Sequence, residues 1–493
     1  MSDGVRRAIR SLGRESARYG FGLALAQLGS FLLMPILTHA LTRSDYGVVS
    51  VALTTASVIS TVAGAGLSSA LLRSYYDMGD DVGRNTVVST SFIVVAAWSC
   101  LLVALSALVG RAGSAALFGS PTLAYLVVVV VFEATGRAVV SVLQSVLRAE
   151  HRAGQFVAVS LVMLVARVVV SWLLVAPLAL GLKGYAVGTV IGMLTGLVHS
   201  VLLVRRRLET RFSLVEARLL VSFGLPVMVA NLAYAVLVGA DRYFLRAWHG
   251  LEAVAVYNVG YQLASIVTVL LVTPINMAWP TILLPMKDSP DLPEFVSRSL
   301  TMVCGLCGWA VVSLAFGGPL LVEIVAPQGY GDAAIVIPIV ALANSMVLVQ
   351  RVLAAGPELT RRMRRYAFPY LVAAIAVVVL DWLVIPGWGM YGAAAATLIA
   401  YALLPVIAYR VGTTLLAIHV ERSRLVAIGG LTAGMTALGI FAGAAVRGSV
   451  LGGTLAMAAG VISYPALLFV LRVIDRRSVL MLWRSLGVAP SSD

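Results

Sequence analysis

Charged side chains inside apolar stretches are the residues of this 493-residue sequence whose types and spacing could do chemistry. Glu133 and Arg137 are four residues apart, so on a helix they share one face and can form an ion pair. Arg167 lies about 11 residues into another apolar run, roughly 16 Å along a helix and near the midplane of a membrane span. No acidic residue on its own run can pair with it.

Helices that contain Glu133, Arg137 and Arg167 are joined by a short connection, so we expect the three side chains to form a cluster with one net positive charge. A charge at the bilayer centre costs about 2.5–3.5 kcal/mol even on the lenient insertion scale, so it needs a partner or a function. The cluster is either a structural triad or an anion site. We favour the anion site, because a guanidinium can hold two phosphate oxygens at once.

Asp241 and Arg242 are the next charged residues within an apolar run. Side chains of helical neighbours point about 100° apart, so we expect no mutual ion pair. Arg242 either contacts an anionic substrate or extends to the outer interface. Arg351 is expected to extend to the inner interface, and Asp381 to lie in water at the outer one. Asp241 and Glu133 are candidates for ion coupling because they are acidic and lie within apolar runs.

Uncharged polar side chains recur at helical spacing and predict faces that point at protein or water rather than lipid. Such faces either join helices by hydrogen bonds or line a hydrated cavity. They include Ser57, Thr61 and Ser68 on one run, Asn231 and Tyr234 on another, and Asn258 and Gln262 on the next. Cys304 and Cys307 lie within an apolar helix, so we interpret this CxxC spacing as inert core cysteines, and we expect no metal site.

Composition identifies the solvent around these residues as lipid. The chain is 60% hydrophobic and 12% charged, whereas soluble domains carry about 25% charged residues. These values exclude a soluble enzyme, and the continuous apolar runs exclude a β-barrel. We predict an all-α polytopic membrane protein of about 14 spans. The spans are 20–41, 47–72, 87–110, 122–147, 156–180, 185–204, 219–247, 253–285, 299–322, 333–356, 368–386, 391–412, 425–446 and 449–471.

The basic residues predict the orientation of these spans. Of the 36 Lys and Arg residues, 27 fall in the two tails and the even-numbered connections, and five fall on the opposite side. Positive charge accumulates on the cytoplasmic side, so both termini are expected there. The outer connections are short, for example Thr42–Tyr46 and Gly181–Gly184, and none could hold a catalytic domain.

An internal repeat relates the two halves of the chain at an offset of 208 residues. Gly181–Gly192 aligns with Gly389–Ala400, and Ser44–Ser50 aligns with Glu252–Asn258 at the same offset. Six spans of like orientation fall in each repeat, which predicts two six-helix bundles related by a pseudo-twofold axis along the membrane normal. The last two spans have no partner. Paired bundles facing a midplane site are typical of transporters.

These features define the expected organisation of the chain. It comprises a basic, cytoplasmic N-terminal segment (1–19), an N-lobe (20–204), a cytoplasmic linker (205–218), a C-lobe (219–412), two extra spans (425–471) and a cytoplasmic tail (472–493). In the first segment, Val5, Ala8, Ile9 and Leu12 lie opposite five arginines. This pattern fits either an interfacial helix or a basic tail that fixes orientation.

Two segments resemble the polysaccharide-transporter branch of the MOP flippase superfamily. The first is LLMPILTHALTRSDYGVVSVA, and the second is FGLPVMVANLAYAVLVGADRYFLRAWHGLEAVAVYNVGYQ. Within the second, Pro226, Asp241, Arg242, Glu252 and Tyr257 fall where the family has its FGLP, DR and E-x-x-x-x-Y elements, while Ala255 replaces the usual glycine. The likeness covers nearly the whole chain in helix number and loop pattern, and it implies the MOP flippase fold.

The resemblance implies a Wzx-like flippase that carries undecaprenyl-pyrophosphate-linked oligosaccharide across the bacterial cytoplasmic membrane by alternating access. Such a protein serves surface polysaccharide assembly, as O-antigen, capsule or exopolysaccharide, beside a polymerase and export machinery. It needs no cofactor, although a proton or sodium gradient could drive it, and it binds lipids but no nucleic acid. On this interpretation Arg137 and Arg167 contact the pyrophosphate, and Glu133, Asn231, Arg242, Asn258 and Gln262 line the cavity.

Three alternatives stay open. A MATE-type exporter of cationic drugs would favour unpaired carboxylates, whereas the midplane residues are two Arg and one Glu. A lipid II flippase resembling MurJ would also have a cationic site. A membrane-embedded transferase would need acidic residues in the outer connections, where Arg, Ser and Gly dominate.

Overall fold

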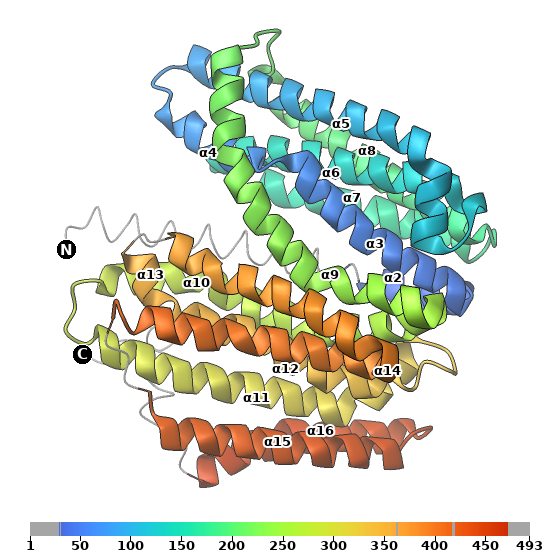
Figure 1. Cartoon of the computed structure of the whole chain (residues 1–493), viewed down its shortest axis with the longest axis vertical. Helices are drawn as coiled ribbons and strands as arrows, with labels where there is room; N and C mark the ends of the chain where they lie inside the picture. The colour runs from blue at the N-terminus through green and yellow to red at the C-terminus, as the bar shows by residue number, and fades with distance from the viewer. Residues whose placement is uncertain (1–28, 30, 361–362, 417–419, 472–493) are drawn as a thin grey trace. The chain divides into compact units, whose positions relative to one another are not determined.

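The protein is described by a computed structural model that covers residues 29, 31–360, 363–416 and 420–471 (Figure 1). Every regular element in these residues is helical. Eleven helical stretches are long and apolar enough to cross a membrane. The predicted all-α membrane fold is therefore confirmed. The basic N-terminal segment, residues 20–28 and 30 of the first predicted span and the C-terminal tail lie outside the described residues.

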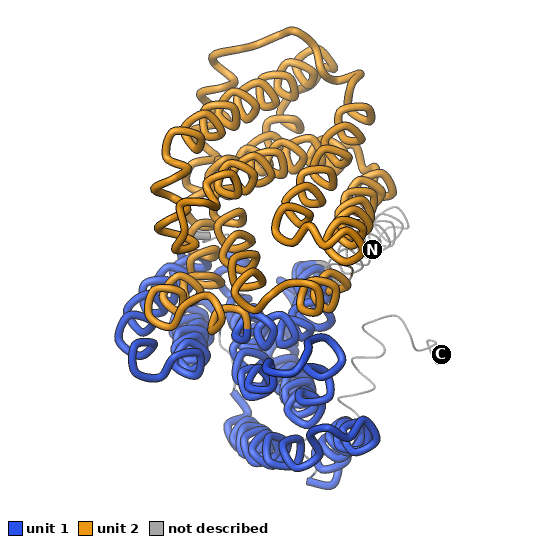
Figure 2. The backbone as a smooth tube through the Cα atoms, turned by 90° about the vertical axis from the view of Figure 1, so that its right-hand side faces the viewer, with its two compact units in different colours: residues 1–13, 256–493 blue, residues 14–255 orange. Residues whose placement is uncertain are grey.

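The helices fall into two compact units, which meet in sequence at Ala255 and Val256 (Figure 2). The described residues up to Ala255, drawn in orange and labelled unit 2 in Figure 2, come first in the sequence and are called the first unit here. Its helices are α2 (Leu33–Ala40), α3 (Arg43–Gly64), α4 (Leu67–Asp77), α5 (Asp81–Phe118), α6 (Ala124–Ala149), α7 (Ala153–Val175), α8 (Gly181–Val204) and most of α9 (Leu214–Ala264).

The described residues from Val256 form the second unit. After the end of α9 come a π-helical turn (Thr268–Val272), α10 (Thr273–Leu283), α11 (Leu292–Val325), α12 (Ala333–Leu353), α13 (Ala355–Leu359), α14 (Met363–Gly412), α15 (Arg422–Ala445) and α16 (Val450–Val470). Helices α15 and α16 pack on α11, where Thr432 and Tyr464 share a hydrogen bond of 2.7 Å between their hydroxyl oxygens.

Two long helices each contain a sharp bend at a glycine. Helix α9 bends at Gly250 and α14 at Gly389, both with a positive φ that favours glycine. The bends fall between predicted spans seven and eight and between spans eleven and twelve. Helix α14 therefore contains two predicted spans, and α9 contains span seven and the first part of span eight. Because part of the first span lies outside the described residues, the total of fourteen stays a prediction.

The helix boundaries repeat at the predicted offset of 208 residues. Gly181, where α8 begins, has a φ of 55°, and Gly389 has a φ of 54°. Helix α8 ends at Val204, and α14 ends 208 residues later at Gly412. The bounds of α5, α6 and α7 correspond in the same way, within a few residues, to those of α11, α12 and the first arm of α14. The repeat therefore exists in structure as well as in sequence.

The second predicted span, 47–72, is not one continuous helix. It breaks between α3 and α4, where Ala65 and Gly66 have φ of 43° and 68°. Gly64 and Gly66 flank this point, but no proline or charged residue does, so the apolar pattern predicts an unbroken span. The cause is a tertiary contact. A Cβ on Gly66 would lie 2.1 Å from the carbonyl oxygen of Gly224, so α9 crosses the break in backbone contact.

Candidate functional site

A cluster of charged and phenolic side chains lies within the first unit, on α6, α7 and α8. Glu133 on α6 is 6% exposed, and its Oε2 accepts a hydrogen bond of 2.8 Å from Nη2 of Arg137 one turn later. The pair forms because residues four apart share a helix face. The predicted Glu133–Arg137 ion pair is confirmed.

Arg167 joins this cluster from α7. Its Nη2 donates a hydrogen bond of 3.2 Å to the hydroxyl of Tyr185 on α8, and its guanidinium carbon lies 5.9 Å from the centre of the Tyr185 ring. Glu133 also attracts Arg167 electrostatically. The structure thus brings together the three predicted residues and adds Tyr185, which sequence analysis missed.

Close helix packing explains the position of Arg167. A Cβ on Gly192 would lie 2.6 Å from the Cβ of Arg167, and a Cβ on Gly188 would lie 2.2 Å from Oγ of Ser171. These glycines of α8 allow α7 to approach closely. The Arg167 side chain then turns toward Tyr185 instead of lipid.

The cluster retains hydrogen-bonding capacity. Nε of Arg167 and Nε of Arg137 are buried and have no partner among the described residues. A cavity of about 10 Å³, lined in part by Glu133, Tyr185 and Thr189, has room for about one water molecule. With two guanidinium groups and one carboxylate, the cluster has one net positive charge. It therefore has donors and charge for an anion.

The second repeat shows that the fold does not require this cluster. At the 208-residue offset, Glu133 corresponds to Ala341, Arg137 to Ser345, Arg167 to Ile375 and Tyr185 to Ala393. The four side chains of the second unit include no charge, although the helices begin and end at equivalent positions. Tyr185 differs from its counterpart in the second repeat, Ala393, and this difference is the sequence signal that could have identified it.

The prediction that Asp241 and Arg242 do not pair is wrong. Oδ1 of Asp241 accepts hydrogen bonds of 2.8 Å from both the backbone N–H and Nη1 of Arg242. The side chains are 2% and 6% exposed, and Nη1 also donates to the carbonyl oxygen of Val238 at 2.7 Å. The aspartate bends toward the backbone and the long arginine folds back on the preceding turn, so the 100° separation does not prevent contact. Arg242 therefore does not extend to the interface.

The remaining predicted cavity residues lie in different units. Asn231 belongs to the first unit, where it lines an open pocket of about 380 Å³ with serine and threonine side chains. Asn258 and Gln262 belong to the second unit, where Asn258 is 4% exposed and Gln262 is half-buried. Whether these residues bind a substrate stays a prediction.

The expectation about one isolated charge in the second unit is also wrong. Asp381 is completely buried rather than solvated, because neighbouring helices cover it although it lies near the end of its predicted span. Arg351 has Nη2 at 3.0 Å from Oε1 of Glu358 and Nη1 at 2.7 Å from the Tyr366 hydroxyl. Whether Arg351 lies at the inner interface stays a prediction.

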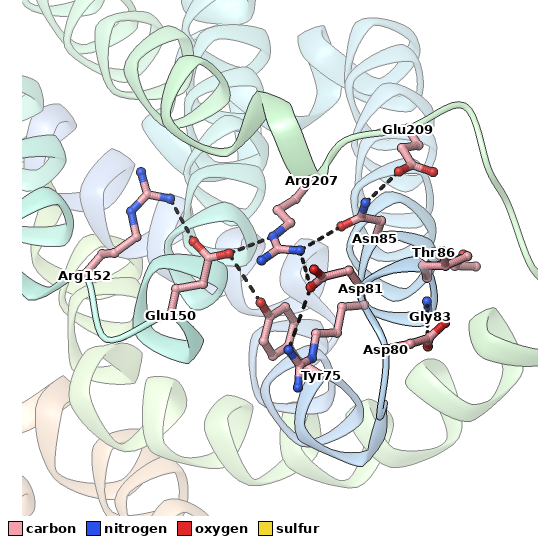
Figure 3. A network of polar contacts seen from close by, with 12 residues as sticks. Tyr75, Asp80, Asp81, Gly83, Asn85, Thr86, Glu150, Arg152, Arg207 and Glu209 are labelled. Carbon is pink, nitrogen blue, oxygen red and sulfur yellow. Dashed lines mark hydrogen bonds and ion pairs between the residues drawn. The ribbon is translucent and has the colours of Figure 1, made fainter.

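A second polar network ties together the ends of α4, α5, α6 and α8 (Figure 3). Oε1 of Glu150 accepts from Nε of Arg207 at 2.8 Å, and Oε2 accepts from Nη1 of Arg152 at 2.8 Å. Nη1 of Arg207 also contacts Oδ1 of Asp81 at 2.7 Å. Partial burial raises the pKa of Glu150, but the hydrogen bonds from the two arginines outweigh it, so the pKa lies below its ordinary value.

This network fits the predicted alternation of the spans. It joins the second, fourth and sixth connections, which the positive-charge rule assigns to one side of the membrane. Their contact shows that they lie at the same end of the first unit. Which side of the membrane that end faces stays a prediction.

Comparisons with known proteins agree with this architecture. The family model described as polysaccharide biosynthesis protein matches residues 36–335. Among solved structures, the lipid II flippase MurJ in an inward closed conformation has a TM-score of 0.73 at 10% identity, covering 92% of this chain and 99% of that chain. No curated protein matches this chain at a significant level.

Two other solved structures are also similar to this chain. A multidrug resistance MATE family transporter of the MOP superfamily, inward-facing, has a TM-score of 0.67 at 13% identity, covering 83% of this chain and 99% of that one. A MOP superfamily transporter from Pyrococcus furiosus has a TM-score of 0.62 at 13% identity and covers 85% and 96%. At these identities the structural likeness shows the fold, which is that of MOP superfamily transporters.

Proposed function

Because the chain belongs to the family of polysaccharide biosynthesis proteins and has the MOP transporter fold, we propose that it is a flippase for undecaprenyl-pyrophosphate-linked oligosaccharide. It moves repeat units from the inner to the outer leaflet of the bacterial cytoplasmic membrane by alternating access. Both termini face the cytoplasm, and the product passes to the polymerase and export machinery of surface polysaccharide. The protein does no covalent chemistry itself.

The observation that carries this proposal is the cationic cluster of Glu133, Arg137, Arg167 and Tyr185 (the N-lobe cluster). A pyrophosphate needs cationic donors inside the membrane, since an unpaired charge there is costly. Arg167 has N–H groups beyond the one that Tyr185 accepts, and its fork fits two phosphate oxygens. Glu133 pairs with Arg137 and lowers the net charge of the cluster to one. The cluster therefore attracts the anion but can still release it.

The polyprenyl tail needs no site of this kind, because it can stay in lipid while the headgroup crosses. Asp241 and Glu133 are the candidates for coupling to a proton or sodium gradient. Both are carboxylates with low exposure in a membrane-spanning helix, and a change in their protonation or ion binding would alter their arginine partners.

Two related functions compete with this proposal. A MATE-type exporter of cationic drugs suits a site with an excess of carboxylates, and the N-lobe cluster has an excess of guanidinium groups. A lipid II flippase suits the cluster equally well, because its substrate is also a polyprenyl pyrophosphate. The family match to polysaccharide biosynthesis favours the oligosaccharide carrier.

Native mass spectrometry of the purified protein separates these functions. The protein is offered polyprenyl-pyrophosphate oligosaccharide, lipid II and a lipophilic cation in parallel. We expect the oligosaccharide lipid to bind best and Arg167→Ala to lose it while remaining folded. Binding of the cation alone would overturn the proposal in favour of drug export. Preferential binding of lipid II would change the proposed substrate to a peptidoglycan precursor.

A further inference from the structure

The first unit contains a pocket without a single charged residue in its lining. It has a volume of about 380 Å³, within the range of small-molecule sites of roughly 300–1,000 Å³. Its walls come from α3, α4, α6 and α9, and its polar lining consists of Ser57, Ser60, Thr61, Ser68, Ser69, Ser141, Asn231 and Tyr234. We call it the hydroxyl pocket. Its lining offers no charged partner to a charged ligand, so it suits an uncharged one better.

The side chains of the hydroxyl pocket are available for hydrogen bonding. Ser68 and Ser141 share a bond of 3.0 Å between their hydroxyl oxygens, and Thr61 donates to the carbonyl oxygen of Ser57 at 2.9 Å. The side chains of Ser60 and Ser69, by contrast, have no hydrogen bond among the described residues. Hydroxyl and amide groups both donate and accept. They therefore match a ligand whose own groups do the same.

The helix break between α3 and α4 opens into this pocket. Gly66, with φ of 68°, is part of the lining. Non-helical backbone within a membrane span is tolerated only where protein covers it or where it borders a hydrated cavity. Gly224 covers one side of Gly66, and the pocket lies on another. The contact with Gly224 accounts for the break, and Gly66 contributes backbone to the wall of the pocket.

The second repeat shows that the fold does not demand a polar pocket here. At the 208-residue offset, Thr61 corresponds to Val269, Ala138 to Met346 and Ser141 to Val349. Gly64 and Ser69 likewise correspond to Val272 and Met277. The second unit fills these five positions with larger, apolar side chains. It keeps a polar residue at three others, where Ser57, Ser60 and Ser68 correspond to Ser265, Thr268 and Asn276.

We propose that the hydroxyl pocket binds the sugars of the lipid-linked substrate and selects uncharged ones. Neutral sugars carry many hydroxyl groups that donate and accept, as the lining does, and the exposed ring of Tyr234 offers an apolar face to their C–H groups. This inference rests on the proposed function, since it names the headgroup class of the same substrate. The pyrophosphate and the sugar then occupy separate places in the first unit: the N-lobe cluster and the hydroxyl pocket.

The test measures binding of three lipids to the full chain in nanodiscs. They are undecaprenyl pyrophosphate without sugar, the same lipid with a neutral oligosaccharide, and the same lipid with a uronic-acid oligosaccharide. We expect the neutral glycan to tighten binding by about tenfold or more over the sugar-free lipid, and the acidic glycan to tighten it less. Equal binding of all three would overturn the sugar pocket and leave the pyrophosphate proposal standing. Tighter binding of the acidic glycan would overturn the selection for neutral sugars. Binding of none would overturn both proposals.

Variants locate the effect in the pocket. Thr61→Val with Ser141→Val introduces the residues that the second repeat carries, so folding is expected to survive. The matched control is Thr86→Val with Ser222→Val. Thr86 makes the same bond to the carbonyl four residues earlier, and Ser222 is exposed, yet neither lines the pocket.

We expect the pocket variant to lose most of the gain from the neutral glycan while binding the sugar-free lipid within about threefold of wild type. The control should keep the full gain. A pocket variant that retains the gain, or a control that loses it equally, would overturn the assignment. Ala138→Met, which fills the pocket instead of removing hydroxyls, should reproduce the loss.

Discussion

Replacing Arg167 by isoleucine tests the anion site with the least disturbance to the fold. The second repeat carries Ile375 at the equivalent position of α14, so these helices accommodate an isoleucine there. In the first unit Arg167 donates to Tyr185 at 3.2 Å and keeps a buried Nε without a partner. Arg167→Ile removes the positive charge and every side-chain N–H donor. Arg167→Lys keeps the charge but loses the paired N–H groups of the guanidinium, which can contact two oxygens at once.

The expected loss of binding free energy follows from the hydrogen bonds that the Arg167 guanidinium can donate. A hydrogen bond to a charged group is worth about 1.5–3 kcal/mol, so a bidentate contact with pyrophosphate contributes about 3–6 kcal/mol. Arg167→Ile should therefore weaken binding of the pyrophosphate lipid by at least about 100-fold. Arg167→Lys, which offers a point charge and loses one of the two bonds, should weaken it by at least about tenfold.

The assay is equilibrium binding of undecaprenyl pyrophosphate to the protein in nanodiscs, with thermal unfolding as the control for folding. The expected order is wild type, then lysine, then isoleucine, at similar unfolding temperatures. Binding by Arg167→Ile within about threefold of wild type would refute the reasoning, because the guanidinium would then be a structural group.

Three further predictions concern the surrounding structure. Gly66→Ala should destabilise the protein by about 2 kcal/mol or more, because it combines a positive φ with a Cβ 2.1 Å from a backbone oxygen. Gly64→Ala, with its nearest neighbour at 3.9 Å, is the control in thermal unfolding and should be neutral or stabilising. Asp241→Asn removes the negative charge from the buried ion pair with Arg242 and should cost about 3–5 kcal/mol; an unchanged unfolding temperature would contradict the pairing. The pKa of Glu150 is lowered in the folded state, so its stabilising contribution is present above pH about 4.3 and is lost as the pH falls through the lower folded pKa. Glu150→Gln should remove this acid sensitivity from the pH dependence of unfolding, and an unchanged profile would contradict it.

Sequence patterns predicted what depends on local spacing and on hydropathy. The helical runs follow from continuous apolar composition, and the Glu133–Arg137 pair follows from the geometry of one helix. The repeat was visible because Gly181 and Gly389 occupy equivalent bends, which need glycine at positive φ. These features require no knowledge of which helices touch.

Features that depend on contacts between helices escaped prediction. The break at Ala65 and Gly66 needs the crossing of Gly224, which lies far away in sequence. The burial of Asp381 likewise depends on neighbouring helices. Tyr185 was overlooked because an aromatic residue near a span end is ordinary in a membrane protein. Comparison with its repeat partner Ala393 would have marked it.

Translocation itself is the central claim, and leaflet exchange in proteoliposomes tests it most directly. The purified protein is reconstituted with fluorescent undecaprenyl-pyrophosphate oligosaccharide in the inner leaflet, and arrival at the outer leaflet is followed with a membrane-impermeant quencher. Wild-type protein should accelerate this exchange, and Arg167→Ile should not. Exchange at the rate of protein-free vesicles, under a proton or a sodium gradient, would contradict the account.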